Sequence, residues 1–330
     1  MSLLARLRRS TLSIVLDWDG TLTRQDTMHY LESVSSISLN SSSQVTSSKA
    51  YGPRPSWSDI VRAYTDDYSA YESAYRPTKA DRTTIAKESA WLASLSVVEQ
   101  KSVRRVEKAG LFKGATTSII QDVAFEAARN DHPMRTGWHE LLSWSSAHQN
   151  VDLTILSVNW SATFIRQVMI DAWGMLDTPV VSVVQGVLEV PIFANEIEDM
   201  DSAGGSSGLL SKAGKPSIRT SKDKLATMKA FHERSGPEEN GRSASRLLMY
   251  VGDSPTDFDT LLAADVGVCI RDEPMGSGQA ALAETFGRVG VEVVHIERLL
   301  DRNVAANQGK LLYWSHDLLG LLSVLEKRDV

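Results

Sequence analysis

Two aspartates, Asp17 and Asp19, stand two residues apart directly after a short apolar run at residues 12–16. The run contains β-branched residues and ends at a charge, which is typical of a buried strand. Residues two apart in an extended chain point to the same side, so both carboxylates can meet one ligand. Two close like charges at a half-buried position need a cation or a proton between them. The pair can share a metal ion or divide the duties of nucleophile and acid–base; alternatively, it is an acidic turn that caps a helix.

Gly20 and Thr21 follow the two aspartates and complete the first motif. Gly20 permits a backbone turn that other residues adopt only with strain. The Thr21 hydroxyl can hydrogen-bond a neighbouring carboxylate or an oxygen of a bound phosphate. The motif therefore combines an acidic pair with a residue that lets the chain turn tightly beside it.

A second acidic motif begins at Gly252, directly after an apolar run at residues 247–251. It contains Asp253 and Asp257, which lie one helical turn apart if a helix begins at Pro255, a residue favoured in the first turn. Carboxylate oxygens suit Mg²⁺, which usually keeps several waters and meets substrate phosphates. The sequence therefore predicts a magnesium site that joins the two acidic motifs.

Two further positions can hold an anion. Ser157 follows an apolar run at residues 153–156, where its hydroxyl and the next backbone N–H groups can bind oxygen atoms. Lys222 and Lys224 can each offset the charge of a phosphate, or each can be an ordinary solvated surface charge.

The elements that must position these residues are short apolar runs alternating with helix-like stretches. The runs are residues 12–16, 153–156, 247–251 and 266–270. This alternation predicts an α/β fold with a Rossmann-like parallel sheet and helices on both faces. Ligands of such sheets bind beyond the carboxyl ends of the strands. Asp17, Ser157 and Asp253 are therefore expected at one edge of the sheet.

Residues 27–133 differ in character and are expected to form an all-helical cap inserted after the first strand. The segment 33–56 is rich in serine and is typical of an exposed or disordered loop. Beyond it, apolar and aromatic residues recur at helical spacing: Trp57, Ile60, Tyr64, Tyr68, Tyr71 and Tyr75. This stripe either packs the cap or lines a ligand pocket. Residues 1–26 and 134–330 then form the α/β core.

Two more helices are expected within the cap. Ser96 and Glu99 match the capping-box pattern at the start of a helix. Residues 115–130 form the other candidate helix, which Pro133 ends.

The composition is that of an ordinary globular protein, with 42% hydrophobic and 23% charged residues. The formal net charge is −6 without a long basic run, so nucleic-acid binding is not expected. No apolar run approaches the roughly 20 residues of a membrane span. Cys269 is the single cysteine, which excludes an intrachain disulfide and favours a reducing compartment. We therefore expect a cytoplasmic protein that binds neither membranes nor nucleic acid.

The four motifs, in this order, resemble those of the haloacid-dehalogenase (HAD) superfamily of phosphohydrolases over residues 10–26 and 134–300. By that resemblance Asp17 is the nucleophile and Asp19 is the acid–base. An acid that begins its work protonated needs a raised pKa, which burial beside the apolar Trp18 can supply.

The resemblance also implies roles for the other motifs. Ser157 and Lys224 would hold the phosphoryl group. Lys224 is preferred to Lys222 because it opens a stretch of apolar residues at helical spacing.

The same resemblance implies a Mg²⁺ cofactor. Asp253 would join Asp17 and the backbone carbonyl of Asp19 around the ion, with Asp257 in a supporting position.

A helical cap directly after the first motif is similar to the group that contains phosphoserine phosphatase. In that group an acid nine residues after the nucleophile meets the substrate's amine, which would make Asp26 a substrate-binding residue; alternatively, Asp26 is a helix N-cap. Thr21 is also expected at the substrate. The sequence Ser157-Val158-Asn159 departs from the usual Ser-Gly-Gly and places Asn159 among the expected substrate-binding residues.

The expected function is a Mg²⁺-dependent phosphatase that hydrolyses a small phosphorylated metabolite through an aspartyl-phosphate intermediate. The nearest alternative is a phosphomutase of the same superfamily, which would return the phosphoryl group to its substrate. A third possibility, from a different class, is a catalytically silent binding or scaffold protein.

Overall fold

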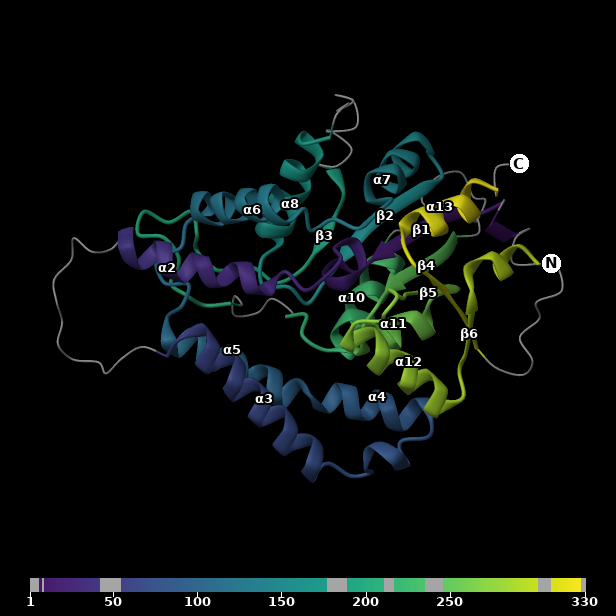
Figure 1. Ribbon diagram of the computed structural model, residues 1–330, viewed down its shortest axis with the longest axis horizontal. Coiled ribbons are helices and arrows are strands. Elements are labelled where there is room, and N and C mark those ends of the chain that lie inside the picture. The colour runs from purple at the N-terminus through teal and green to yellow at the C-terminus, as the bar shows by residue number, and fades with distance from the viewer. Residues whose placement is uncertain are drawn as a thin grey trace.

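The computed structural model describes residues 6–7, 9–41, 55–176, 189–210, 217–234, 246–301 and 310–327. Its centre is a seven-stranded sheet in the order β3-β2-β1-β4-β5-β7-β6, with every neighbouring pair parallel (Figure 1). The strands are β1 (Thr11–Leu16), β2 (Val151–Leu156), β3 (Ile192–Phe193), β4 (Arg246–Gly252), β5 (Val266–Ile270), β6 (Glu292–His295) and β7 (Leu311–Ser315). The predicted α/β class is confirmed, and so are the four strands expected from the apolar runs.

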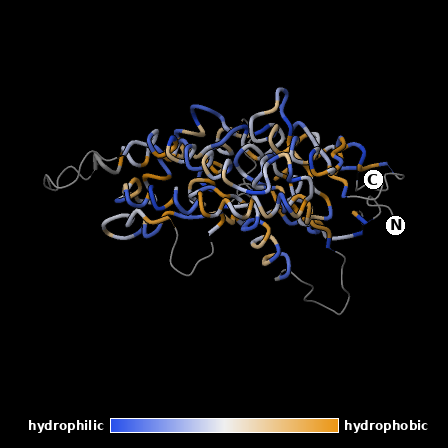
Figure 2. Tube along the Cα trace, turned by 90° about the horizontal axis from the view of Figure 1, so that it is seen from below, coloured by the Kyte–Doolittle hydropathy of each residue, from blue (hydrophilic) through white to orange (hydrophobic). Residues whose placement is uncertain are grey.

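Strand β1 shows why these runs are almost wholly apolar. Leu12, Ile14 and Leu16 pack into one hydrophobic core, whereas Val15 packs into a second core on the opposite face. Side chains alternate across a strand, so a strand buried on both faces needs apolar residues at nearly every position. In Figure 2, hydrophobic stretches concentrate in the interior of the trace and hydrophilic ones lie towards its outline.

Helices cover both faces of the sheet. One core contains residues of α7 (Trp138–Ala147), α8 (Ala162–Gly174) and α13 (Leu318–Glu326). The other contains residues of α10 (Ser221–Arg234), α11 (Phe258–Ala263) and α12 (Ser277–Val289). Strand β1 lies between β2 and β4, so the chain adds strands first on one side of it and then on the other. That point, where strand order reverses, is where open α/β sheets bind their ligands.

The predicted helical insertion lies between β1 and α7. Its helices are α2 (Leu31–Ser41), α3 (Trp57–Ala74), α4 (Ile85–Ser94), α5 (Ser96–Ala109) and α6 (Thr117–Asp131). They form two groups: α2 and α6 pack together, with α6 against α8, whereas α4 contacts α10 and α5 contacts α3 (Figure 1). Thr23 forms an antiparallel bridge with Met134, so the chain leaves and re-enters the core at adjoining points. The domain limits after residues 26 and 133 stay a prediction.

Much of the tyrosine stripe packs the insertion, as one of its two interpretations proposed. The rings of Tyr68, Tyr71 and Tyr75 surround Trp91 of α4, with centroid distances of 6.0, 5.8 and 4.9 Å. These aromatic contacts fix α3 against α4. Tyr64 is the exception, because its hydroxyl donates to Glu99 of α5.

A buried ionic network joins the insertion to the core. Arg82 is 1% exposed, pairs with Glu88 at 2.9 Å and places its guanidinium over Trp91, 4.5 Å from the ring centroid. Arg288 of α12 reaches the same Glu88 carboxylate at 3.0 Å. Because both arginines share one carboxylate, α4 and α12 are held in a fixed relation.

The serine-rich segment differs in part from its prediction. Residues 33–41, expected as loop, belong to α2, and Val34 is fully buried there. Burial of Leu31 and Val34 against α6 outweighs the weak helix propensity of serine, which is a matter of tenths of a kcal/mol per residue. Residues 42–54 lie outside the described residues. Among those described, no helix has both the length and the apolar character that crossing a membrane requires.

Gly137 provides a test of this packing. Its φ is +86°, and an added Cβ would lie 2.3 Å from the backbone nitrogen of Leu319 in α13. Gly137→Ala should therefore lower the free energy of unfolding by about 2–3 kcal/mol, measured by urea denaturation. Gly174→Ala is the matched control, since a Cβ there meets nothing within 4 Å; it should leave stability unchanged or raise it by up to about 1 kcal/mol. Equal stability of the two variants would contradict the packing at Gly137.

Candidate active site

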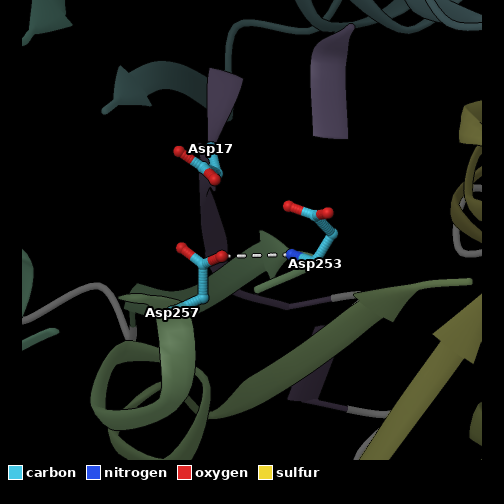
Figure 3. A group of neighbouring side chains, drawn as sticks. All are labelled: Asp17, Asp253 and Asp257. Atoms are coloured by element: carbon cyan, nitrogen blue, oxygen red, sulfur yellow. Dashed lines mark hydrogen bonds between the residues drawn. The ribbon is translucent and has the colours of Figure 1, made fainter. Parts of the chain in front are cut away.

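The predicted nucleophile lies at the carboxyl end of the central strand. Asp17 follows β1, is 3% exposed and donates its backbone N–H to the carbonyl of Val251 in β4 at 2.9 Å. Carboxylate oxygens of Asp17, Asp253 and Asp257 lie within 4.8 Å of one another, and all three residues are buried (Figure 3). The two acidic motifs therefore meet at one edge of the sheet, and the structure places this meeting point where strand order reverses.

Lys224 is buried among these carboxylates. It is fully buried, and its ammonium lies 2.7 Å from Asp17 Oδ1 and 2.7 Å from Asp257 Oδ1. Burial acts to lower the pKa of Lys224, but the ion pairs with Asp17 and Asp257 raise it above its usual value. Lys222, the other candidate, is exposed. The structure therefore brings Lys224, rather than Lys222, to the acidic cluster.

Asp257 has hydrogen-bond donors at both carboxylate oxygens. Besides Lys224, the hydroxyl of Tyr250 donates to Oδ1 at 2.6 Å. The backbone N–H groups of Asp253 and Ser254 donate to Oδ2 at 3.1 and 3.0 Å. These donors, Lys224 foremost, hold the pKa of Asp257 below its usual value although burial alone would raise it. Asp257 thereby orients Lys224 and the Asp253 backbone, whereas its supporting position at a metal ion stays a prediction.

The turn after Asp17 needs glycine. Gly20 has φ +74°, and a Cβ at this position would lie 2.2 Å from Asp253 Oδ2. The Thr21 hydroxyl donates to Asp253 Oδ1 at 3.4 Å. Of the two partners proposed for Thr21, a neighbouring carboxylate or a bound phosphate, the structure shows the carboxylate.

The cluster carries more negative than positive charge. Burial first, and then the neighbouring carboxylates, raise the pKa of Asp17 well above its usual value and that of Asp253 to about 8. Three buried carboxylates face one lysine, Lys224, with Arg135 contributing to Asp253 from further away. A divalent cation would supply the missing positive charge, and oxygen donors at this spacing suit Mg²⁺. The residues present therefore fit a metal ion held by Asp17 and Asp253.

Asp19 faces away from that cluster. Its Oδ1 accepts from the backbone N–H and the hydroxyl of Thr27 at 2.7 and 2.5 Å, and its Oδ2 accepts from the Asn159 amide at 3.1 Å. Burial, with a smaller contribution from Asp26, raises the pKa of Asp19 to about 6, while the bonds from Thr27 and Asn159 act to lower it. The raised pKa expected of an acid–base residue is present.

Asn159 is placed differently from its prediction. It is fully buried, and its amide contacts Asp19 and Thr27, so it acts on the acid–base candidate and not on the cavity. Its backbone N–H donates to Ser157 Oγ at 3.0 Å, which fixes the hydroxyl at the end of β2. An amide side chain two residues after Ser157 thus adds a contact to Asp19 that glycine could not make.

Arg135 is a residue of the site that the sequence did not indicate. It is 3% exposed, and it donates to the backbone carbonyls of Gly20 and Thr21 at 2.8 and 2.9 Å. It also forms a salt bridge with Asp272, which Gln279 supports through a 2.7 Å bond. Arg135 therefore clamps the turn that carries the first motif. It lies outside the motifs, and no spacing in the sequence connects it with Gly20.

A cavity of about 610 Å³ opens above the aspartates. Asp17, Asp19 and Asp253 form part of its wall, and residues of α3 and α5 form another part. Asp26 is exposed on this wall and accepts the backbone N–H of Met28 at 2.7 Å. Both interpretations of Asp26 thus have a structural counterpart, since it bonds the chain ahead of it and also borders the cavity.

Curated relatives share about a quarter of their residues with this chain. A CTO1 family protein of Schizosaccharomyces pombe is 24% identical over 265 residues, covering 78% of this chain and 81% of that protein. Cold tolerance protein 1 of Saccharomyces cerevisiae is 25% identical over 269 residues, covering 76% and 75% respectively. The bifunctional TH2 protein of Arabidopsis thaliana, a mitochondrial protein, is 24% identical; the match covers 88% of this chain and 44% of that protein. No protein-family model matches.

The solved structures similar to this one include phosphatases. A phosphoserine phosphatase with an analogue of its phospho-aspartyl intermediate has a TM-score of 0.45 and 12% identity, covering 96% of this chain and 98% of that one. A HAD family hydrolase of Salmonella enterica has a TM-score of 0.43 and 16% identity, covering 80% and 64%.

Asp253 gives a test of the charge imbalance that needs no substrate. A carboxyl with a pKa of about 8 in the folded state and its usual value when unfolded stabilises the metal-free protein fully at low pH and loses that contribution as pH rises towards 8. Asp253→Asn cannot ionise, so its melting temperature in chelator should exceed that of the wild type, by more at pH 8 than at pH 5. Mg²⁺ added at pH 8 should raise the melting temperature of the wild type but not of Asp253→Asn.

Asp66→Asn on the exposed face of α3 is the control and should follow the wild type at both pH values. If the melting temperatures of Asp253→Asn and wild type differed by the same amount at pH 5 and pH 8, the pKa of Asp253 would not be raised in the folded protein.

Proposed function

We propose that the protein is a phosphohydrolase of the haloacid-dehalogenase superfamily that cleaves a phosphomonoester through an aspartyl phosphate on Asp17. The observation that carries the proposal is the buried cluster where strand order reverses, with Lys224 at 2.7 Å from Asp17 and the carboxylates of Asp253 and Asp257 beside it. A core gains no stability from three carboxylates around one ammonium, since each uncompensated buried charge is costly. A functional requirement explains why they are there.

In the first half-reaction, a carboxylate oxygen of Asp17 attacks phosphorus in line with the leaving oxygen. The new oxygen–phosphorus bond forms as the bond from phosphorus to the alcohol oxygen breaks. Asp19 is protonated at the start and gives its proton to that alcohol oxygen. Lys224 and the Ser157 hydroxyl stabilise the charge on the transferred phosphoryl group.

In the second half-reaction, Asp19 is a carboxylate and takes a proton from water. The water oxygen attacks phosphorus, the bond from phosphorus to Asp17 breaks, and inorganic phosphate leaves. The hydrogen bonds from Thr27 and Asn159 keep the Asp19 carboxylate in one orientation for both proton transfers.

The proposed cofactor is Mg²⁺, held by Asp17, Asp253 and the backbone carbonyl of Asp19. When bound, it supplies positive charge that offsets both the carboxylates and the phosphate. Arg135 and Asp257 keep the ligand-bearing segments in place, through the carbonyl of Gly20 and the backbone N–H of Asp253.

The phosphate-free part of the substrate is proposed to lie in the cavity, with Asp26 on its wall as a selecting residue. We propose a small phosphorylated metabolite rather than a macromolecule, because the catalytic residues border a concave pocket of about 610 Å³, a size that suits a small ligand. A cytoplasmic location without membrane or nucleic-acid partners stays a prediction, based on the single buried Cys269 and the net charge of −6.

The two alternatives differ in measurable products. A phosphomutase would carry the same aspartyl phosphate but return it to an organic hydroxyl, so inorganic phosphate would not accumulate. A scaffold protein would form neither phosphate nor a phosphoenzyme. Net release of inorganic phosphate from a generic aryl phosphate in Mg²⁺ separates the proposed phosphatase from both.

Asp17→Asn should lower turnover to below about a thousandth of the wild-type rate, a loss of more than ~4 kcal/mol of transition-state stabilisation, because the attacking carboxylate is removed. The variant should fold, and its melting temperature should match or exceed that of the wild type, since a buried charge is lost. Fluoride complexes of beryllium should inhibit the wild type in Mg²⁺. Turnover of Asp17→Asn above the stated level, with the fold intact, would disprove covalent catalysis by this residue.

Asn159→Ala tests how the acid–base is tuned. Its amide bond acts to lower the pKa of Asp19, so its removal should raise that pKa above about 6. Turnover needs protonated Asp19 in the first half-reaction and should fall as pH rises through this pKa. In a plot of turnover against pH, the falling limb should therefore move to higher pH in Asn159→Ala, whether or not the maximal rate changes. Gln167→Ala on α8, whose amide bonds Asp171, should leave the limb in place; an unmoved limb in both variants would exclude the role of Asn159.

A further inference from the structure

The cavity extends well beyond the residues that would handle phosphate. Its volume of about 610 Å³ includes a region walled by α3 and α5 of the insertion and by Trp160, which follows β2. Cavities in this range hold drug-sized ligands with one or more rings, and a phosphorylated hydroxy acid of three carbons would leave most of the space to water. The residues that line this outer region therefore indicate which alcohol part the substrate carries.

One side of this region is an aromatic corner. Trp57 and Trp160 are both half-buried and meet edge to face, with ring centroids 6.0 Å apart. Phe112, which is fully buried, supports Trp160 from behind in a second edge-to-face contact at 6.1 Å. Ile60 and Val61 of α3 extend the apolar surface. The two rigid indole rings lie at 64° to each other, so a planar ligand can stack on the face of one ring and contact the other at its edge.

The same cavity wall also carries a polar group, the carboxylate of Glu99. The sequence pattern assigned Glu99 to a capping box with Ser96, but α5 begins without a side-chain cap, and Glu99 turns to the cavity instead. Tyr64 donates to Glu99 Oε1 at 2.6 Å. Within the described residues, this is the hydrogen bond that the Glu99 carboxylate makes, and the side chain is partly open to the cavity.

The surroundings of Glu99 favour another donor. Burial raises the pKa of Glu99, and the bond from Tyr64 together with the charge of Arg219 acts to lower it. A partly buried carboxylate that borders a cavity can accept a further donor at its second oxygen. Because Arg219 already contributes positive charge nearby, a neutral N–H group meets this need.

We infer that the alcohol part of the substrate is a planar ring system bearing an N–H group, packed against Trp57 and Trp160 with its N–H directed to Glu99. The inference rests on the proposed phosphatase function and specifies which phosphomonoesters that site accepts. It predicts that the enzyme distinguishes between phosphomonoesters by their alcohol parts, through residues of the insertion that lie away from phosphorus and take no part in the chemistry.

Two bicyclic probes that differ in the N–H group test the inference: indol-3-yl phosphate and 1-naphthyl phosphate, compared by kcat/KM in Mg²⁺. We expect at least a tenfold preference for the indolyl ester. Glu99→Gln keeps an oxygen acceptor for Tyr64 but loses the charge, and it should lower kcat/KM for the indolyl ester about tenfold while leaving the naphthyl ester within about twofold. Gln100→Ala, on the exposed side of the same helix, should change neither.

The aromatic corner is tested separately with phosphoserine as the ring-free ester. Trp57→Leu should raise KM for both bicyclic esters several-fold and spare phosphoserine. Equal effects of Glu99→Gln on the two bicyclic esters, or no preference in the wild type, would overturn the inference while leaving the phosphatase in place.

Failure of the proposed function gives a different result, namely no phosphate release from any of the three esters. Isothermal titration of Asp17→Asn in Mg²⁺ with the two bicyclic esters then decides the inference without turnover. Tighter binding of the indolyl ester, lost in the Asp17→Asn, Glu99→Gln double variant, supports it; equal affinities overturn it.

Discussion

The site depends on one electrostatic constraint: three carboxylates are buried at the carboxyl edge of a parallel sheet, and the described part of the chain places a single ammonium among them, that of Lys224. Such a cluster is stable only if each oxygen is held by a donor or balanced by a cation. Both carboxylate oxygens of Asp257 accept hydrogen bonds, and the Asp253 carboxylate accepts one from Thr21. Arg135 fixes the turn at Gly20, which carries the first motif. Even the glycine at position 20 follows from this constraint, because any side chain there would overlap the Asp253 carboxylate.

The core of the fold could be predicted because short-range patterns determine it. Apolar runs without alternation require strands buried on both faces, and acidic residues directly after two such runs must meet at the strand ends. Asp17, Asp253, Asp257 and Lys224 are accordingly together in the structure. The short strand β3 and the strands β6 and β7 carry weaker patterns and were not expected.

Long-range contacts account for what the sequence did not reveal. Arg135 reaches Gly20 across more than a hundred residues, and nothing near it in the chain marks it as part of the site. The sequence pattern placed Glu99 in a helix cap, and the resemblance placed Asn159 among the substrate-binding residues. In the fold, each side chain is directed to a residue far along the chain, Tyr64 and Asp19. The serine-rich part of α2 is helical for the same kind of reason, since burial against α6 exceeds a weak local preference.

The division of the inserted helices into two groups has a consequence for how selectivity can change in evolution or in the laboratory. One group covers α8 and the other covers α10, and Arg288 ties α4 to α12. Grafting a foreign cap in place of residues 27–133 would leave two hydrophobic flanks of the core bare and an arginine without its carboxylate. New substrates are therefore more accessible through single replacements on the cavity wall than through the exchange of whole caps.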